Sequence, residues 1–369
     1  MADWSEEFAL TSYRFMLVDR DSGMESRVIT SLKGGSITRN DDTRIKESAE
    51  FGMLGDDSFG PDLVRVYMTA EWADGSKSDV ALGTFIPVVP GRSVRFGYST
   101  ATVRMYGRLQ ELLDDSFPTP VTVEKGENAL DRVKSVITQS GLDVIAEASD
   151  YKVAETRVYG VGAKQNNSEV GDKKLDMVND LLDLAGFRAA YTDPMGRVVL
   201  ERYRDPGDIS PSWSFKEGSG AKFESDMEEE RDYTDAANHV VVVYGPTTDG
   251  DVVTAEAWDR DPNSPLSTVS RGRTITRSYS YSDLPPGSND GERLEYAENR
   301  AKTLLSTAQS VIWRIRMRHA YAPVAVNDTV SVEYPSGGIE DVFQVRAQTL
   351  RLVGGCPVEA EVRKFRRRA

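Results

Sequence analysis

The chain has 369 residues and a net charge of −14, from 45 basic and 59 acidic side chains, and 39% of its residues are apolar. This length predicts two or three domains, and the acidic balance disfavours nucleic acid or anionic lipid as a binding partner of the whole molecule. No stretch approaches the roughly 20 consecutive apolar residues of a spanning helix, so we expect no membrane-spanning segment.

Cysteine and histidine are scarce. The single cysteine, Cys356, cannot form an intramolecular disulfide or a thiolate zinc site. His239 and His319 are the only histidines and lie 80 residues apart. They offer little material for a histidine-based catalytic triad or a multi-histidine metal site. We therefore expect no metal and no cofactor, and a hydrogen-bonded structural role for each imidazole.

The N-terminal sequence MADWSEEFAL is acidic and lacks the basic start and apolar core of a secretory signal. The sequence therefore predicts synthesis and folding in a reducing cytoplasm.

Residues 1–115 are predicted to form an antiparallel sandwich or barrel, because β-branched and aromatic residues alternate with polar ones between turn-forming clusters. Gly34-Gly35-Ser36 lacks the lysine and the following helix of a phosphate-binding loop, so a β-bulge is predicted there. The six expected strands are 8–19, 27–38, 44–54, 63–72, 80–89 and 102–112.

Residues 116–204 are predicted to form an α+β insertion. Apolar residues recur at helical spacing over 128–140 and 173–185, and a glycine follows each segment at Gly141 and Gly186. A hairpin is expected next, with strands 187–192 and 197–203 around the turn Asp193-Pro194-Met195-Gly196.

Residues 205–369 are predicted to form a second β domain that can share strands with the first half. The apolar run 239–244 fits a strand that is buried on both faces. A long helix is expected over about 290–310, with Leu294, Ala297, Ala301, Leu304 and Leu305 on one stripe. The remaining predicted strands are 311–319, 329–334, 341–352 and 358–365.

A weak internal echo links the two β regions. Residues 64–83 and 330–345 both read as a strand, a glycine-containing turn, an Asp-Val pair and a second strand. The pattern predicts two similar hairpins and leaves open whether they belong to a true structural repeat.

Two charged clusters are candidate interaction sites. The acidic cluster lacks the residue order of an EF-hand, so a solvated face and the wall of a negatively charged passage both remain open. The basic cluster is expected either to solubilise the chain or to bind nucleic acid or an acidic surface of a partner protein, and the acidic chain favours the partner protein over nucleic acid. The acidic residues are Glu224, Asp226, Glu228, Glu229 and Glu230, and the basic ones are Arg363, Lys364, Arg366, Arg367 and Arg368.

No catalytic residues are predicted. Glycoside cleavage would need two carboxyl groups about 5 to 10 Å apart across a sugar-binding groove. Among 59 acidic residues some pair will always meet that distance, and nothing in the sequence selects one. We therefore expect that the chain is not an enzyme.

The order of these elements resembles that of tail hub proteins of tailed bacteriophages, the baseplate-hub or tail-tip family that includes the N-terminal regions of tail-associated lysins. The resemblance covers nearly the whole chain. It rests on the segments LKGGSITR (32–39), RIKESAEF (44–51) and LGTF (82–85), the helices 131–141, 173–187 (ending LAGF) and 295–305, and the finish around NDTV (327–330).

The resemblance implies a mainly β fold with two tube-like antiparallel β-barrel domains, 1–115 and 205–369, and smaller α+β domains. It implies a homotrimer, in which three copies of two similar barrels adapt a sixfold tube to a threefold fibre. Many relatives continue into a peptidoglycan hydrolase, and we expect no such module in this chain, which stops at Ala369.

The same resemblance implies a structural role at the tail tip of a virion, in attachment and genome ejection, after assembly in the host cytoplasm. The implied partners are a distal tail or tail tube protein, a tape measure protein and a receptor-binding fibre or spike. DNA would be a partner only in passage, and the acidic cluster would then be a candidate for the channel wall, because acidic walls repel phosphates.

Two other functions remain open at this point. A carbohydrate- or cell-surface-binding β-protein would line a groove with exposed aromatic residues, and a cell-wall hydrolase would carry a catalytic pair. The tryptophans are scattered, and only Trp313 is at a clearly core-like strand position. The full set is Trp4, Trp72, Trp213, Trp258 and Trp313.

Overall fold

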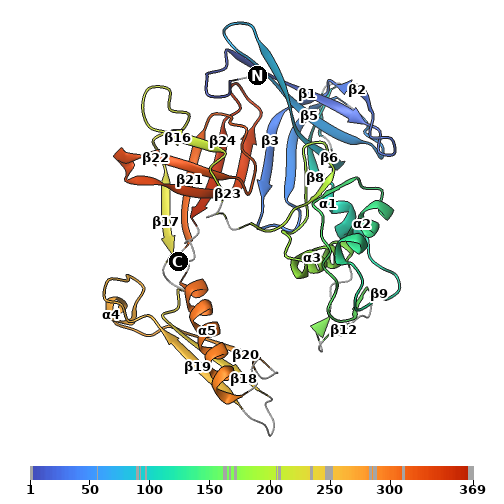
Figure 1. Cartoon of the computed structure of the whole chain (residues 1–369). Coiled ribbons are helices and arrows are strands. Elements are labelled where there is room, and N and C mark those ends of the chain that lie inside the picture. Colours follow the sequence, from blue (N-terminus) through green and yellow to red (C-terminus); the bar gives the residue numbers. More distant parts are fainter. Residues whose placement is uncertain are drawn as a thin grey trace. The chain divides into compact units, whose positions relative to one another are not determined.

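The computed structural model describes residues 3–364 except 56, 89–90, 92, 96–97, 161–163, 166–167, 170–172, 205, 207–208, 233–235, 246–251, 282–284, 286–288 and 310–311. The chain divides into two compact units (Figure 1). Unit 1 comprises residues 1–226, 317–341 and 345–361, and unit 2 comprises 227–316, 342–344 and 362–369. The fold class is mainly β with α+β elements, as the sequence predicts.

A large, mostly antiparallel sheet forms the body of unit 1. Along it the strands follow the order β24-β23-β3-β4-β8-β6-β5-β1-β2. Its N-terminal strands are β1 (Leu10–Val18), β2 (Glu25–Ile29), β3 (Leu32–Asn40), β4 (Glu47–Leu54), β5 (Leu63–Glu71), β6 (Lys77–Val88), β7 (Ser93–Arg95, paired with β8) and β8 (Tyr98–Gly107).

The predicted strand 27–38 is in fact two strands. β2 pairs with β1, β3 pairs with β4, and only Thr30 and Ser31 separate them. The predicted bulge is confirmed, because the register of β3 against β4 shifts between Leu32 and Gly35. A Cβ at Gly35 would lie 2.0 Å from the carbonyl oxygen of Glu50, so this bulge requires glycine.

The predicted strand 102–112 is wrong at its C-terminal end. β8 ends at Gly107, and α1 (Leu109–Asp114) follows it. Leu109 and Leu112 are buried one helical turn apart, and they pack into the core of the α+β region rather than into the sheet.

The α+β region between residues 109 and 200 has its own hydrophobic core in unit 1. The two predicted amphipathic helices are confirmed, and the Asn128 side chain caps the first by accepting from the Asp131 N–H at 3.1 Å. The elements are β9 (Val121–Val123), α2 (Ala129–Gln139), β10 (Val144–Ala146), β11 (Arg157–Tyr159), β12 (Lys164–Gln165), β13 (Ser168–Glu169), α3 (Lys174–Leu184), β14 (Tyr191–Thr192) and β15 (Val198–Leu200).

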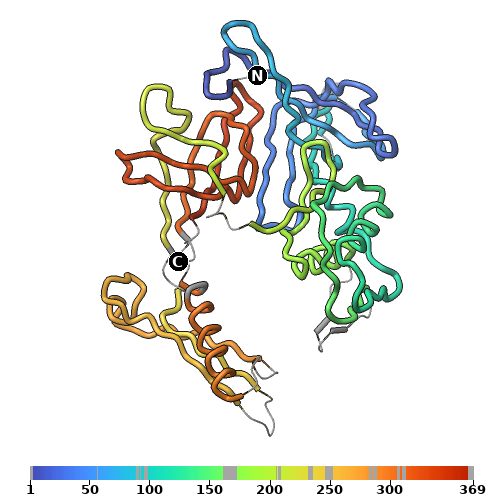
Figure 2. The backbone as a smooth tube through the Cα atoms, viewed as in Figure 1, coloured from blue at the N-terminus to red at the C-terminus, as the bar shows by residue number. Residues whose placement is uncertain are grey.

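Strands from the C-terminal half continue the sheet of unit 1. Residues 347–351 of β23 pair with residues 36–40 of β3, so segments far apart in sequence lie side by side (Figure 2). β16 pairs in parallel with β22, and β22 pairs with β23. The strands are β16 (Trp213–Lys216), β21 (Ile312–His319), β22 (Thr329–Tyr334), β23 (Ile339–Arg351) and β24 (Val358–Lys364), with a 3₁₀ turn at Pro335–Gly337.

Both segments of the internal echo are hairpins, as predicted. β5 and β6 pair across the turn that contains Gly75, and β22 and β23 pair across the turn that contains Gly337 and Gly338. The described pairings form an open path of strands, so whether the sheet makes two barrels stays a prediction.

Unit 2 contains a separate three-stranded sheet in the order β19-β18-β20, with α5 against it. The predicted long helix is confirmed, but Leu294 is 43% exposed rather than part of the packed stripe. Its elements are β17 (Glu228–Asp232), β18 (His239–Tyr244), β19 (Val253–Trp258), α4 (Thr268–Arg271), β20 (Thr276–Tyr281) and α5 (Asp290–Ala308).

Strand β18 is not buried on both faces as predicted. Val240, Val242 and Tyr244 pack into the core that α5 closes, whereas Val241 and Val243, on the opposite face, are only partly buried. The alternation of strand side chains explains the difference, since α5 packs against one face of the sheet.

Candidate functional site

The acidic candidates are divided between the two units. Glu224 and Asp226 are exposed in unit 1, and the Glu224 N–H donates to the Arg318 carbonyl at 2.8 Å. In unit 2, Glu228, Glu229 and Glu230 are consecutive residues of β17. Because side chains alternate along a strand, Glu229 projects to the opposite face from Glu228 and Glu230.

Two of the β17 carboxylates face arginines on β21. Glu230 Oε2 lies 2.8 Å from Arg314 Nη1, and Glu228 Oε2 lies 3.4 Å from Arg316 Nη1. The strands pair antiparallel, which sets these residues directly opposite each other. We call these two ion pairs the charge ladder, and they partly neutralise the acidic cluster.

The basic candidates are only partly within the described residues. Arg363 and Lys364 are the last two residues of β24, and the Lys364 ammonium lies 5.4 Å from the centre of the Trp313 ring. Arg366, Arg367 and Arg368 lie outside the described residues. Trp313 also contacts the Arg231 guanidinium at 4.4 Å and Phe343 edge-on at 5.0 Å, so Lys364 belongs to a local cation–π cluster in unit 2.

Both histidines are hydrogen-bonded structural side chains, as predicted. His239 Nδ1 lies 2.9 Å from Thr276 Oγ1, and its ring stacks on Trp258 with centroids 3.5 Å apart. His319 Nδ1 donates to the Ala320 carbonyl at 2.7 Å beside Phe215. Burial lowers the pKa of His319 to about 4, so this imidazole is neutral at pH 7.

Each tryptophan packs against neighbouring side chains of its own unit. Trp72 is buried at the end of β5, which the sequence did not predict, and Trp4 packs against it and Tyr321 with ring centroids 5.2 and 5.3 Å apart. Trp258, the tryptophan with 37% exposure, is covered by His239 and by the Arg260 guanidinium at 4.7 Å.

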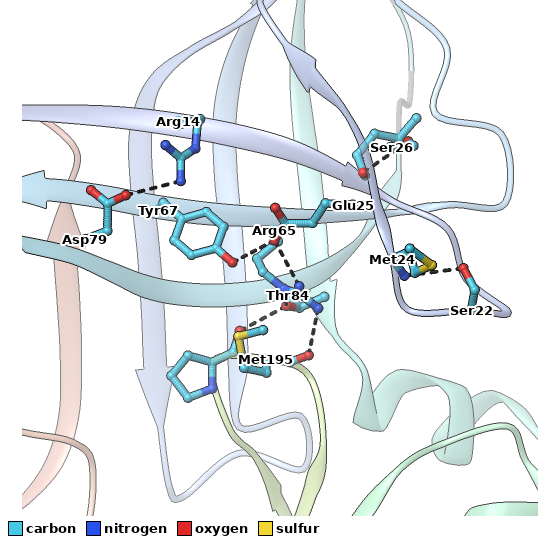
Figure 3. A network of polar contacts seen from close by, with 12 residues as sticks. Arg14, Ser22, Met24, Glu25, Ser26, Arg65, Tyr67, Asp79, Thr84 and Met195 are labelled. Atoms are coloured by element: carbon cyan, nitrogen blue, oxygen red, sulfur yellow. Dashed lines mark hydrogen bonds and ion pairs between the residues drawn. The ribbon is translucent and has the colours of Figure 1, made fainter.

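A buried polar network lies where the turn after β14 meets the first sheet, and we call it the junction (Figure 3). Arg65 on β5 is 6% exposed, and its Nε donates to Thr84 Oγ1 on β6 at 2.9 Å. Its Nη2 donates to the Met195 carbonyl at 3.1 Å, and its Nη1 pairs with Glu25 Oε1 on β2 at 3.1 Å.

The junction includes further contacts on both sides of Arg65, one towards Tyr67 and Arg14 and the other towards the turn at Pro194. On the outer side Tyr67 donates to the same Glu25 oxygen at 2.6 Å, and the Arg14 guanidinium lies 5.0 Å from the Tyr67 ring (Figure 3). On the inner side Thr84 donates to the Pro194 carbonyl at 2.9 Å. A Cβ at Gly196 would lie within 3.0 Å of Arg108 and Thr84, so the turn needs glycine to approach the sheet this closely.

The junction contains a second buried charge, which contacts the same hairpin. Glu47, the first residue of β4, is 6% exposed, and its Oε1 accepts a hydrogen bond from Thr192 Oγ1 at 2.6 Å. Burial raises the pKa of Glu47 to about 7, against the lowering effect of the nearby Arg39 cation.

Glu47 and the hairpin line a pocket of about 430 Å³ within unit 1. Its walls are mostly apolar, from Ile145, Tyr191, Val199, Ala325 and Val326. Most of its acids already have basic partners: Asp41 pairs with Arg346, Asp193 with Arg197, and Glu201 with Arg188. The pocket therefore combines apolar walls with internally compensated charges.

The described residues contain no helix long and apolar enough to cross a membrane. Within the same residues, no three His, Cys, Asp or Glu side chains come together as they would around a metal ion.

Comparison with known proteins gives a result at the level of structure. No protein-family model matches the sequence, and no curated protein matches it. The fold, in contrast, is similar to that of solved phage tail proteins along nearly the whole chain.

Three of these structures are a tail protein from Neisseria meningitidis, the 43 kDa tail protein of prophage MuSo2 from Shewanella oneidensis and a prophage tail protein from Listeria monocytogenes. Their TM-scores are 0.64, 0.59 and 0.54 at 15%, 11% and 12% identity, each covering 95% of this chain and 96%, 97% and 94% of the other. A chain of the Francisella PdpA–VgrG complex also matches, with a TM-score of 0.56 at 8% identity over 96% of this chain and 58% of that one. The resemblance to the tail hub family is thus confirmed at the level of the fold.

The junction was not found by sequence reasoning. Arg65 and Glu47 sit in ordinary alternating strands, and their partners Met195 and Thr192 lie 130 and 145 residues further along the chain. The only local signal was the turn Asp193-Pro194-Met195-Gly196, which was predicted as a turn but not as a docking element.

Proposed function

We propose that this chain is the structural hub protein of a phage or prophage tail. In this role three copies form a ring that joins the tail tube or distal tail ring to a receptor-binding fibre or spike and encloses the DNA path. The observation that carries the proposal is the likeness to three phage or prophage tail proteins over 95% of the chain, rather than over one module.

The strand pairings support the two-barrel part of the proposal. The sheet path from β3 through β4, β8, β6, β5 and β1 ends at β2, and β2 continues into β3 after two residues. A single bent strand would therefore sit at both ends of the path, which is how a sheet can close on itself.

The pairings of the C-terminal strands follow a comparable pattern. The path β22-β23-β24-β21 runs between β16, which pairs with β22, and Phe223, which bridges to His319 on β21. Trp213–Lys216 and Phe223 again lie on one continuous stretch of chain, so the second path has its two ends on neighbouring segments. Two rings per subunit would give a trimer six similar faces.

The acidic cluster remains a candidate for the channel wall in this proposal. Glu228 and Glu230 share a face of β17, whereas Glu229 projects the other way, so these three would not all line one channel. Arg363 and Lys364 remain candidates for a partner contact, together with Arg366, Arg367 and Arg368. A trimer structure with Glu228 and Glu230 on the outer rim would rule out their channel role.

Native mass spectrometry tests the hub assignment. We expect the purified chain, alone or mixed with the distal tail protein of the same phage, to give a species of three times the 40.8 kDa monomer. In the phage, deletion of the gene should yield tails without fibres, and the full-length chain should restore them. A strict monomer in both samples together with normal tails after deletion would contradict the proposal.

The two other functions have direct tests of their own. A specific signal on a glycan array would support a carbohydrate-binding role, and clearing in a cell-wall zymogram would support a hydrolase. The covered faces of Trp4, Trp72, Trp258 and Trp313 make the first outcome unexpected.

A further inference from the structure

The β14–β15 hairpin is attached to the first sheet by two different kinds of contact. At its turn, Arg65 and Thr84 bind backbone carbonyls, and these bonds do not depend on protonation near neutral pH. At the end of β14, the Glu47 side chain makes one hydrogen bond among the described residues, which it accepts from Thr192. This second contact involves a group that titrates.

The groups around Glu47 stabilise its ionised carboxylate only weakly. Two groups favour the ionised carboxyl: the Arg39 cation on β3, whose Nη2 already donates to the Leu82 carbonyl at 2.5 Å, and the Thr192 hydroxyl. Burial of the carboxyl outweighs both. From the hairpin, Asp193 opposes the negative charge. Gly107 of β8 packs against the Glu47 side chain and offers no side-chain donor.

The other titratable groups on the pocket wall are already engaged. Lys46 donates to the Asp41 carbonyl, and Asp41 pairs with Arg346. Glu201 pairs with Arg188. Burial raises the pKa of Tyr191, and the negative charge of Glu201 raises it further. Arg108, beside the turn, pairs with Glu111 at 2.9 Å. None of these groups is placed to compensate a new negative charge at Glu47.

We propose that Glu47 is a proton-dependent latch that holds the β14–β15 hairpin against strand β4. While its carboxyl is protonated, it can stay buried against Thr192. When it ionises, the buried negative charge favours hydration, and the adjoining pocket gives water and the hairpin room to separate the two groups.

The direction of the pH effect follows from linkage. Glu47 binds its proton more tightly in the latched state than in water, where its pKa is 4.5. Latching is therefore favoured at low pH and is lost as the pH rises towards about 7. The opening equilibrium should increase up to about tenfold per pH unit across this window and level off above it.

Hydrogen–deuterium exchange of the full chain tests the latch. The reporter is the peptide that contains Asp193, whose N–H donates to the Arg197 carbonyl within the hairpin, and a peptide from α2 serves as the reference. After correction for intrinsic exchange, we expect hairpin opening to rise from pH 5 to pH 7 while α2 remains unchanged. A flat profile at the hairpin would overturn the proposal.

Two variants identify the titrating group. Glu47→Gln keeps the size and the acceptor of the side chain but cannot ionise, so its hairpin should stay protected and lose the pH dependence. Asp328→Asn is the matched control, because Asp328 is a partly buried carboxyl near Arg188 and Glu201 whose pKa is also raised by burial. The control should keep the wild-type slope. If Asp328→Asn removes the slope, or Glu47→Gln keeps it, the latch is not Glu47.

Discussion

Charged residues are used in opposite ways in the charge ladder and in the junction. In the ladder, Glu228 is 77% and Arg316 is 56% exposed, so water solvates both partners whether or not they touch. In the junction, Arg65 and Glu47 are each 6% exposed and depend on specific protein partners. Exposed ion pairs typically contribute about 0 to 1 kcal/mol, whereas breaking a buried charge network costs about 3 to 5 kcal/mol. The charge ladder, which is formed by the acidic cluster visible in the sequence, is therefore expected to contribute less to stability than the buried charges of the junction.

The strongest test of this comparison is Arg65→Met, which keeps an unbranched apolar stem and removes the charged guanidinium. We expect a loss of about 4 kcal/mol in the free energy of unfolding, because Glu25 loses its partner and the Met195 carbonyl loses its donor. Urea denaturation measures the loss. Arg316→Met is the matched ladder variant, with an expected loss of less than about 0.5 kcal/mol. Equal losses would break the comparison.

The buried imidazole of His319 predicts a pH effect opposite in sign to that of Glu47. Its pKa is lowered from 6.5 to about 4, so the folded chain binds this proton less readily than the unfolded chain does. The stability it contributes is complete above pH 6.5 and is lost as the pH falls towards 4, by up to about 3 kcal/mol.

Thermal unfolding of wild type and His319→Gln at pH 4.5, 5.5 and 7 checks this effect. The difference in stability between the two proteins should shift in favour of the variant as the pH falls. A difference that is independent of pH would show that His319 does not titrate on unfolding.

Thr192→Val removes the hydrogen bond to Glu47 while preserving the shape of the side chain. We expect a loss of about 1 to 2 kcal/mol, because a buried carboxyl is left without a donor. Thr138→Val is the control, since its hydroxyl bonds the Lys134 carbonyl on an exposed part of α2, and less than about 0.5 kcal/mol is expected there. Chemical denaturation at pH 5, where the Glu47–Thr192 contact is closed, compares them.

The smallest effect is expected in the ladder itself. Glu230→Gln should cost about 0.3 kcal/mol at low salt and nothing measurable in 1 M NaCl, where the Debye length is about 3 Å. A double-mutant cycle with Arg314→Gln isolates the pair. A coupling above about 1.5 kcal/mol that persists in salt would mean that the ladder is shielded from water, for example in an assembly.

Sequence patterns were reliable where a structure is stabilised locally. The helices at 128–140 and 173–185, the bulge at Gly35 and both echo hairpins follow from periodicity and turn chemistry, and all of them are present. They failed where a neighbouring element changes the environment. Residues 109–112 read as the end of a strand but form a helix, because Leu109 and Leu112 pack into the α+β core.

By itself, the sequence determined the mainly β fold, the α+β region and the resemblance to tail hubs, because these depend on alternation, helical spacing and the order of elements. The tertiary structure alone decided which charges matter. In Val64-Arg65-Val66 the arginine occupies the alternating position of an ordinary surface residue, until the turn at Pro194 and Met195 folds over it. Burial of a charge is set by contacts between residues more than a hundred positions apart, and a local pattern carries no information about those contacts.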